Sequence, residues 1–237
     1  MPERSGTGWV TTRRAALGAG VTAVGLAACS GPEGADTPGA GVPGTGTAPE
    51  ATPSCVLTPE GTEEPYYLDL DLVRGDLVEG RPGVPLTLRT TVVDADTCEP
   101  LPDASVDIWH ADATGVYSGI RSEGTEGENF LRGVQVTDEE GAAEFSTLYP
   151  GWYDRRTVHV HVKVHLAGDV VHTGQLYFED DTNALVAATD PYAGRADRVV
   201  VNADDMFSGT IGPENTLRAT GSPEAGYRAS IVLGVRA

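Results

Sequence analysis

Three of the five histidines of this chain stand in one stretch, TVHVHVKVHL, residues 157–166. They alternate with valine and leucine, and a period of two is that of a β-strand with one apolar face and one polar face. Neighbours on one face stand ~6.6 Å apart, so the imidazoles of His159 and His161 can converge on one metal ion. His165 lies ~13 Å beyond His161 and cannot join them. A polar strand face exposed to solvent would show the same alternation. Further donor side chains are therefore needed to indicate a metal site.

Two tyrosines that precede this stretch stand in segments that suggest a known family. In FSTLYPGWYDRRTVHVH, Pro150 and Gly151 turn the chain and place Tyr153 six residues before His159, and Tyr117 ends the segment WHADATGVY. These segments resemble the intradiol ring-cleaving dioxygenases, whose ferric ion is held by two tyrosines and two histidines. Further matches are LTPEGTEEPYY, VPLTLRTTVVDADTCEPLPDASVDIWHADATGVYSG and the Gln-x-Tyr-Phe element, so the resemblance covers most of residues 55–178.

The resemblance implies one non-haem Fe(III) per chain, with Tyr117, Tyr153, His159 and His161 as its ligands. The residue types agree with that ion, because Fe(III) is a hard acid that favours phenolate oxygen. A bound cation also brings a tyrosine, whose ordinary pKa is about 10, into its anionic form at neutral pH. In the family, the tyrosine that matches Tyr153 leaves the iron when substrate binds, and its phenolate can then take a substrate proton.

Two further residues match family positions beside the metal. Arg156 stands three residues before His159, and its fixed charge could stabilise an electron-rich aromatic carbon. Gln175, in HTGQLYF, matches a family glutamine near the iron, which could form hydrogen bonds with the residues that surround the metal ligands. A surface ion pair for Arg156 and an ordinary strand position for Gln175 are the alternatives. Glu64 departs from the family, which usually has glycine before this proline, and the short segment from Tyr153 to His159 departs too; we expect both to reshape the mouth of the pocket.

The sequence pattern predicts that β-strands carry these residues. Short apolar or alternating runs recur between turn residues: PLTLRTTVVD, ASVDIWH, RGVQVTD, AAEFSTL, TVHVHVKVHL, VVHTGQLYF and ASIVLGV. No stretch holds a helical period over three turns, and DEEG and LAGD are typical of hairpin turns. The pattern predicts an all-β fold, an antiparallel β-sandwich of the transthyretin (prealbumin) type. Residues 180–228 are expected to form long loops, with a helical turn around residues 189–193.

The charge and the motifs of the chain limit the binding partners and cofactors that can be expected. The formal net charge is -19 over 237 residues, which disfavours a nucleic-acid partner because phosphates would be repelled. The chain lacks both a Gly-x-Gly-x-x-Gly fingerprint after a strand and a Gly-x-x-x-x-Gly-Lys-Ser/Thr loop, so nothing suggests a nicotinamide, flavin or nucleotide. A homo-oligomer is left open.

The first residues read as an export signal. Arg13 and Arg14 precede an uncharged run that is too short for a membrane span, TTRRAAL resembles a twin-arginine signal, and GLAAC resembles a lipobox. We therefore expect a lipoprotein signal over residues 1–29, a lipid on Cys29, a flexible tether rich in Gly and Pro over residues 30–54 and one catalytic domain over residues 55–237. This organisation predicts attachment to the outer face of the cytoplasmic membrane. An ordinary signal peptide with an incidental cysteine is the alternative.

Cys55 and Cys98 are the two remaining cysteines. Export to an oxidising compartment favours a disulfide between them, and a metal-binding pair is the alternative, although no Cys-x-x-Cys spacing supports it.

The family resemblance implies a dioxygenase that opens a catechol-type aromatic 1,2-diol with O₂, between its hydroxylated carbons, to a muconate-type diacid. A transthyretin-like binding module without turnover, at the cell surface, is the competing hypothesis. A zinc or copper carrier that uses His159 and His161 would leave both tyrosines unexplained.

Overall fold

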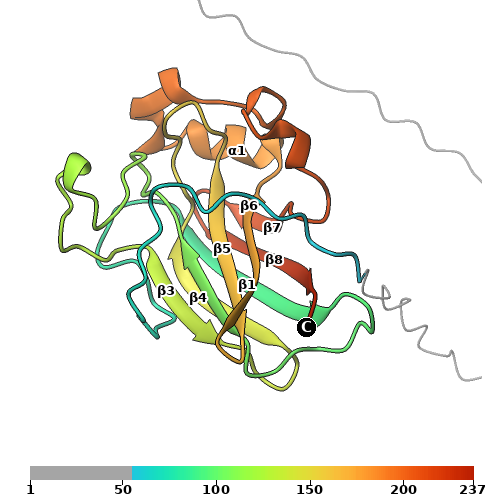
Figure 1. Ribbon diagram of the computed structural model, residues 1–237. Coiled ribbons are helices and arrows are strands. Elements are labelled where there is room, and N and C mark those ends of the chain that lie inside the picture. Colours follow the sequence, from blue (N-terminus) through green and yellow to red (C-terminus); the bar gives the residue numbers. More distant parts are fainter. Residues whose placement is uncertain (1–54) are drawn as a thin grey trace, which may run out of the picture. The chain divides into compact units, whose positions relative to one another are not determined.

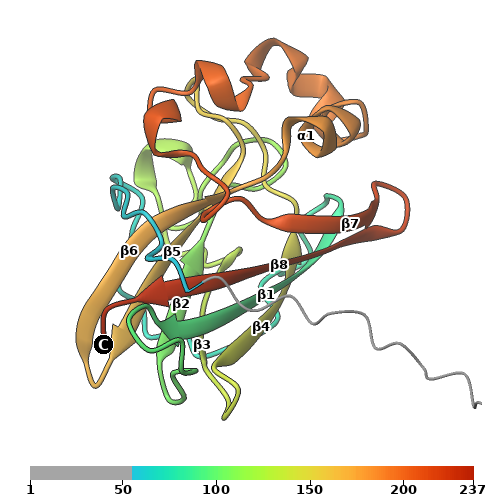
Figure 2. The same cartoon turned by 90° about the vertical axis from the view of Figure 1, so that its right-hand side faces the viewer.

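The computed structural model describes residues 55–237, which form two packed β-sheets with helical segments gathered at one end (Figures 1 and 2). The predicted signal and tether, residues 1–54, lie outside the described residues. One sheet has the order β4 (Ala142–Leu148), β1 (Pro85–Asp94), β8 (Gly226–Val235), β7 (Arg218–Ser222). The other has the order β3 (Arg132–Val136), β2 (Ser105–Trp109), β5 (His159–Leu166), β6 (Asp169–Tyr177). The predicted β-sandwich is therefore confirmed.

The core lies between the sheets and follows the alternation in the sequence. Val158, Val160, Val162 and Val164 are all fully buried in it, together with Leu88 of β1. Removing an aliphatic side chain of this size from water stabilises a fold by about 1.5–3 kcal/mol. This term fixes which face of β5 points inward, and it places the histidines on the opposite face.

The strand pairing differs from the prediction in two places. Pairing is antiparallel except between β1 and β8, which run parallel from Leu86, opposite Tyr227, to Asp94, opposite Val235. The DEEG segment forms a tight turn in which the Gly141 N–H donates to the Asp138 carbonyl oxygen at 2.9 Å. It leads from β3 in one sheet to β4 in the other, so it is not a hairpin within one sheet.

The LAGD segment is a true hairpin turn between β5 and β6. Ala167 and Gly168 both have positive φ, 52° and 94°, as a two-residue turn of the primed type requires.

The prediction of loops over residues 180–228 was wrong in part. The helix α1 (Asp180–Ala187) and the strand β7 lie there, with 3₁₀ turns at Tyr192–Arg198, Asn202–Asp204 and Ser208–Thr210. A further 3₁₀ turn, Arg121–Glu123, lies between β2 and β3.

The topology brings the connecting segments of the second sheet to one end. Because β5 runs antiparallel to both β2 and β6, the end of β2, the start of β5 and the end of β6 meet there. The long connection after β2, the connection from β4 to β5 and the helical region after β6 therefore share this end (Figure 2). None of the helices in the described part of the chain is long and apolar enough to cross a membrane.

The leading segment, residues 55–67, runs across β6 and β5 (Figure 1). The Gly61 N–H donates to the Thr173 carbonyl oxygen at 3.0 Å, and Lys163 donates to Glu63 at 2.6 Å. The polar face of β5 is consequently covered by the chain itself, so the alternative of a solvated face does not hold.

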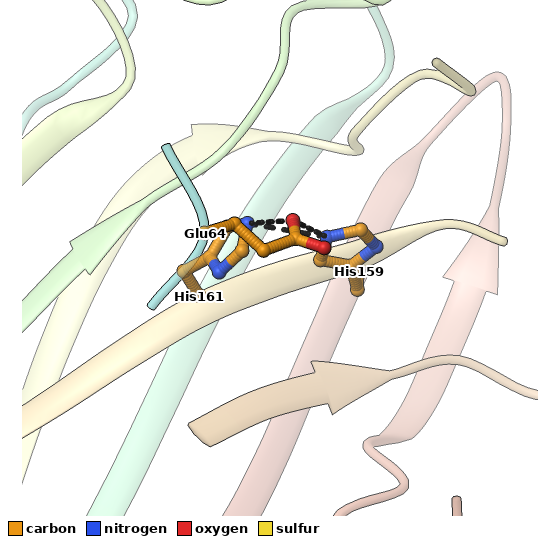
Figure 3. A group of neighbouring side chains, drawn as sticks. All are labelled: Glu64, His159 and His161. Carbon is orange, nitrogen blue, oxygen red and sulfur yellow. Dashed lines mark hydrogen bonds and ion pairs between the residues drawn. The ribbon is translucent and has the colours of Figure 1, made fainter. Parts of the chain in front are cut away.

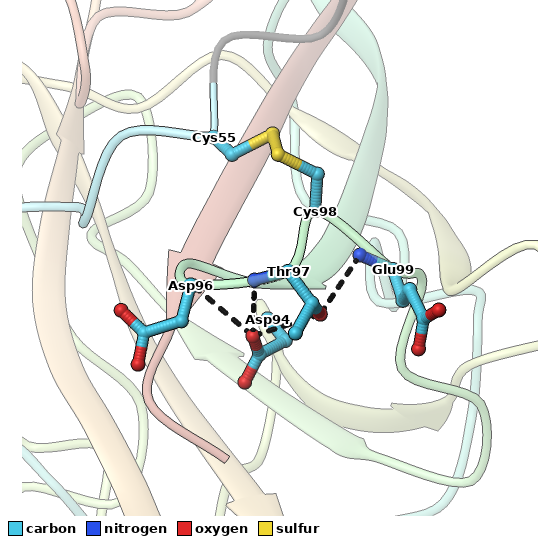
Figure 4. Close-up of a disulfide and its surroundings, with 6 residues drawn as sticks. All are labelled: Cys55, Asp94, Asp96, Thr97, Cys98 and Glu99. Atoms are coloured by element: carbon cyan, nitrogen blue, oxygen red, sulfur yellow. Dashed lines mark hydrogen bonds between the residues drawn. A yellow bond between two sulfur atoms is a disulfide. The ribbon is translucent and has the colours of Figure 1, made fainter.

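A disulfide joins Cys55 to Cys98, with Cα atoms 5.2 Å apart (Figure 4). Cys98 follows a turn in which the Asp94 carboxylate accepts hydrogen bonds from the backbone N–H groups of Asp96, at 3.0 Å, and Thr97, at 2.7 Å. The predicted pairing of these cysteines is present, and it fixes the start of the leading segment.

Candidate active site

His159 and His161 lie at the start of β5, with their imidazoles side by side. Their Nε2 atoms are 3.2 Å apart, and both side chains are fully buried. The Nδ1–H of His159 donates to the Thr157 carbonyl oxygen at 2.7 Å, which leaves its Nε2 directed into the site. His161 is oriented by stacking on Trp109, with ring centroids 4.9 Å apart, while its Nδ1 has no hydrogen-bond partner among residues 55–237.

The two tyrosines complete an arc of donor atoms. The Oη of Tyr153 lies 3.0 Å from Nε2 of His159, and the Oη of Tyr117 lies 3.1 Å from Nε2 of His161. Tyr117 comes from the connection after β2, and Tyr153 from the connection between β4 and β5. The sequence reasoning named all four residues, and the structure places their donor atoms next to one another.

Close backbone contact holds the two tyrosine-bearing connections together. The Gly151 N–H donates to the Asp112 carbonyl oxygen at 3.1 Å, and a Cβ at position 151 would lie only 2.5 Å from that oxygen. A Cβ on Gly115 would similarly lie 2.2 Å from the Trp152 carbonyl oxygen. Glycine is required at both positions because any side chain would push the connections, and with them Tyr117 and Tyr153, apart.

The buried surroundings keep His161 and both tyrosines neutral in the protein alone. Burial lowers the pKa of His161 to about 3. Burial also raises the pKa of Tyr117 well above its ordinary range, and that of Tyr153 further still, where neighbouring Tyr117 and Glu64 add to the effect. Only a nearby cation of high charge would bring these phenols into their anionic form.

The donor set fits the ferric ion that the family resemblance implies. Successive donor atoms along the arc are 3.0–3.2 Å apart. Ligands that bind one small cation at about 2.0–2.2 Å stand at roughly such separations from one another. Two phenol oxygens and two imidazole nitrogens suit a hard trivalent ion better than zinc or copper(I).

A fifth donor, Glu64, lies in the same cluster (Figure 3). Its Oε2 accepts a hydrogen bond from Tyr153 Oη at 2.5 Å and lies 3.3 Å from Nε2 of His161 and 3.7 Å from Nε2 of His159. The three residues Glu64, His159 and His161 form a group able to hold a metal ion. The sequence predicts only that Glu64 reshapes the pocket mouth, and its departure from the family's glycine is the signal that could reveal its place.

Comparison with known proteins identifies the family. The sequence matches the profile of a family described as "Dioxygenase" over residues 62–220. The chain belongs to the intradiol ring-cleavage dioxygenase family. The solved intradiol ring-cleavage dioxygenase from Tetranychus urticae is similar over 77% of this chain and 95% of that chain, with 33% identity and a TM-score of 0.72. The dioxygenase domain of a carbohydrate-binding fusion protein from Streptomyces sp. SirexAA-E is 28% identical over 76% of this chain and 98% of that chain, with a TM-score of 0.58.

A curated relative matches a shorter part of the chain. The catechol 1,2-dioxygenase of Acinetobacter baylyi is 35% identical over 101 residues, which cover 40% of this chain and 32% of that protein. The chain thus spans about a third of the length of that relative.

Arg156, the residue matched to the family's arginine, is buried and multiply bound. Its Nε donates to Asp205 at 2.9 Å, its Nη2 donates to Gln175 Oε1 at 2.6 Å, and its Nη1 pairs with Glu64. The guanidinium also lies 4.5 Å above the centre of the Phe207 ring. This burial excludes the alternative of a surface ion pair for Arg156. Asp205, which the sequence reasoning missed, supplies a fully buried counter-charge.

Gln175 contacts the arginine rather than the donor atoms. Its Oε1 also accepts from Tyr177 Oη at 2.7 Å, and its Nε2 donates to the Thr62 carbonyl oxygen at 3.0 Å. Gln175 thus links β6, Arg156 and the leading segment, which is more than an ordinary strand position requires.

A cavity of about 510 Å³ opens beside the tyrosines of this dioxygenase-family site. Tyr66 and Tyr153 line it, together with several acidic residues and the basic residues Arg155 and Arg198. Tyr66 stacks on Tyr117 with ring centroids 4.3 Å apart. A second cavity, of about 490 Å³, is lined by Glu64, Tyr153 and Arg156 among others. Small molecules therefore have room on the side of Tyr153 and Glu64.

Proposed function

We propose that this chain is a non-haem Fe(III)-dependent intradiol dioxygenase that cleaves a catechol-type aromatic 1,2-diol with O₂ to a muconate-type diacid. The observation that carries the proposal is the buried arc of Tyr117, Tyr153, His159 and His161, whose donor atoms lie 3.0–3.2 Å apart beside a cavity. Membership of the intradiol family supports it, and so does the relative named as a catechol 1,2-dioxygenase.

The ferric ion, when bound, would supply the Lewis acid that holds the diol oxygens and draws electron density from the ring. The tyrosines of the chain would balance charge at this step. A diol that binds through both oxygens brings two negative charges, so release of one phenolate keeps the site near neutrality. Tyr153 is suited to this release because it lines the cavity, whereas Tyr117 is fully buried behind it. The released phenolate can accept one of the two protons that such a diol loses, and the other would pass to solvent through the adjoining cavity.

Arg156 would act on the substrate as a fixed positive charge. Asp205 and Gln175 hold its guanidinium in one orientation, so it needs no reorganisation when electron density moves towards O₂. Gln175 is then a positioning residue, which acts through Arg156.

The test is oxygen uptake by the iron-loaded protein with catechol, 4-substituted catechols, protocatechuate and hydroxyquinol, with product masses measured. We expect uptake with at least one diol and a product that carries both atoms of O₂. Tyr153→Phe should lower kcat, whereas Tyr227→Phe, a buried tyrosine of β8, should leave it near wild type. Tight binding of aromatic diols without any oxygen uptake would favour the binding-module hypothesis instead.

We also propose that the domain is exported and held at the outer face of the membrane by a lipid on Cys29. The Cys55–Cys98 disulfide supports this location, since such bonds persist in oxidising compartments. Cys29→Ser should move the protein from the membrane fraction to the soluble fraction. Equal solubility of both proteins outside the cell would refute the anchor.

A further inference from the structure

We propose that Glu64 is a fifth ligand of the metal ion, a carboxylate that the chain itself supplies and that the diol must displace together with Tyr153. This inference rests on the proposed metal site and extends it.

The position of the carboxylate matches that of a ligand. Its Oε2 lies 2.5 Å from Tyr153 Oη, 3.3 Å from His161 Nε2 and 3.7 Å from His159 Nε2, which is close to the spacing among the other donors. A carboxylate oxygen is a hard donor that suits the same ion as a phenolate. Its second oxygen, Oε1, pairs with Arg156, and such an outer contact is how ligating carboxylates are commonly oriented.

The backbone holds Glu64 in place despite an unfavourable conformation. Its φ of 56° lies in the left-handed region, and the following Pro65 disfavours any helical backbone at this position. The contacts on either side fix it: the Glu64 N–H donates to Thr62 Oγ1 at 3.1 Å, and Gln175 holds the Thr62 carbonyl oxygen. Strained residues of this kind persist where their surroundings over-determine them, often at functional sites.

The same geometry makes Glu64 a displaceable ligand. The side chains of His159 and His161 are fully buried, whereas that of Glu64 is 11% exposed and lines the second cavity together with Tyr153. The oxygens of Glu64 and Tyr153 are neighbours, so their two positions suit the two adjacent oxygens of a diol. The leading segment, pinned at Cys55, thus supplies an occupant of the substrate position.

The charge of the site gives a test that does not depend on turnover. Three anionic ligands neutralise a trivalent ion, whereas the two phenolates alone leave one positive charge. Azide should therefore bind the iron-loaded wild type weakly. It should bind Glu64→Gly at least tenfold more tightly, because this variant lacks the negative charge of the carboxylate and has no side chain to block access of azide to the ion. Glu64→Gly also suits the positive φ, so this variant is expected to fold.

Azide titrations followed by the visible tyrosinate-to-iron band would measure this difference, with the rate of iron loss to a chelator as a second readout. Glu64→Gln should resemble Glu64→Gly in azide affinity. Glu63→Gln is the matched control, since Glu63 pairs with Lys163 and should behave as wild type. Equal azide affinity and equal band positions in wild type and Glu64→Gly would overturn the role of Glu64 alone. Absence of the band in the wild type would overturn the iron site, and this inference with it.

Discussion

Asp205 ties the connection after α1 to the start of β5, and its removal should destabilise the fold and the site together. Its Oδ2 accepts hydrogen bonds from Arg156 Nε at 2.9 Å and from the Thr157 N–H at 2.7 Å. Its Oδ1 accepts from the Phe207 N–H at 2.8 Å. The carboxylate is fully buried, so none of these groups would regain water easily in Asp205→Ala.

The loss of stability in Asp205→Ala can be estimated from the buried groups that lose their partner. Removal of one partner from a buried ion pair typically costs about 3–5 kcal/mol, and the lower end applies because Arg156 keeps Glu64 as a counter-charge. The unpaired Thr157 N–H adds about 1 kcal/mol or more. We therefore expect Asp205→Ala to lower the free energy of unfolding by about 4 kcal/mol, a large part of the 5–15 kcal/mol typical of a domain.

Urea unfolding followed by tryptophan fluorescence can measure this loss, because Trp152 donates to the Val200 carbonyl oxygen in the same connection. Asp204→Ala is the matched control, since Asp204 is the exposed neighbour and should change stability by less than about 0.5 kcal/mol. A loss below about 1 kcal/mol in Asp205→Ala, or one equal to that of Asp204→Ala, would refute the reasoning.

Three further outcomes are expected. The disulfide closes a loop with a sequence separation of 43, so replacing Cys55 and Cys98 with serine should cost about 4 kcal/mol in urea unfolding; an unchanged midpoint would contradict this. Burial lowers the pKa of His110 from 6.5 to about 4, so the unfolded chain binds a proton first and stability falls as the pH drops through that window, by on the order of 3 kcal/mol. His110→Gln should flatten this pH dependence of the free energy of unfolding, and an undiminished slope would exclude His110 as its source. Arg156→Lys keeps a charge but loses the fork geometry, so kcat should fall by up to ~10² with iron retained; wild-type turnover would show that the orientation of the charge is unimportant.

Much of the sandwich could be predicted because its strands carry their own signals. The valines of β5 alternate with polar residues over the whole strand, and the turn at Ala167 and Gly168 contains the small residues that positive φ requires. The elements that were missed have no such pattern. The edge strand β7, with sequence RATGS, is largely exposed and packs only Ala219 against the core, and α1 has only eight residues.

Long-range pairing could not be predicted from local patterns. The parallel neighbours β1 and β8 are separated by most of the domain, and the turn residues of DEEG do not reveal that the strands on either side enter different sheets. In the site, His159 and His161 recur at strand spacing, and the family resemblance identified them as ligands together with Tyr117 and Tyr153. Glu64 and Asp205 each follow another acidic residue in an irregular segment, and only the fold brings them to Arg156.

The proposed metal site consists of a ferric ion held by Tyr117, Tyr153, His159 and His161. Its most direct test is the metal content and visible absorption of the purified domain after expression with iron supplied. We expect one iron per chain and a reddish tyrosinate-to-iron charge-transfer band that Tyr117→Phe alters and His161→Ala abolishes through loss of iron. A colourless wild-type protein that holds one zinc and no iron would contradict it.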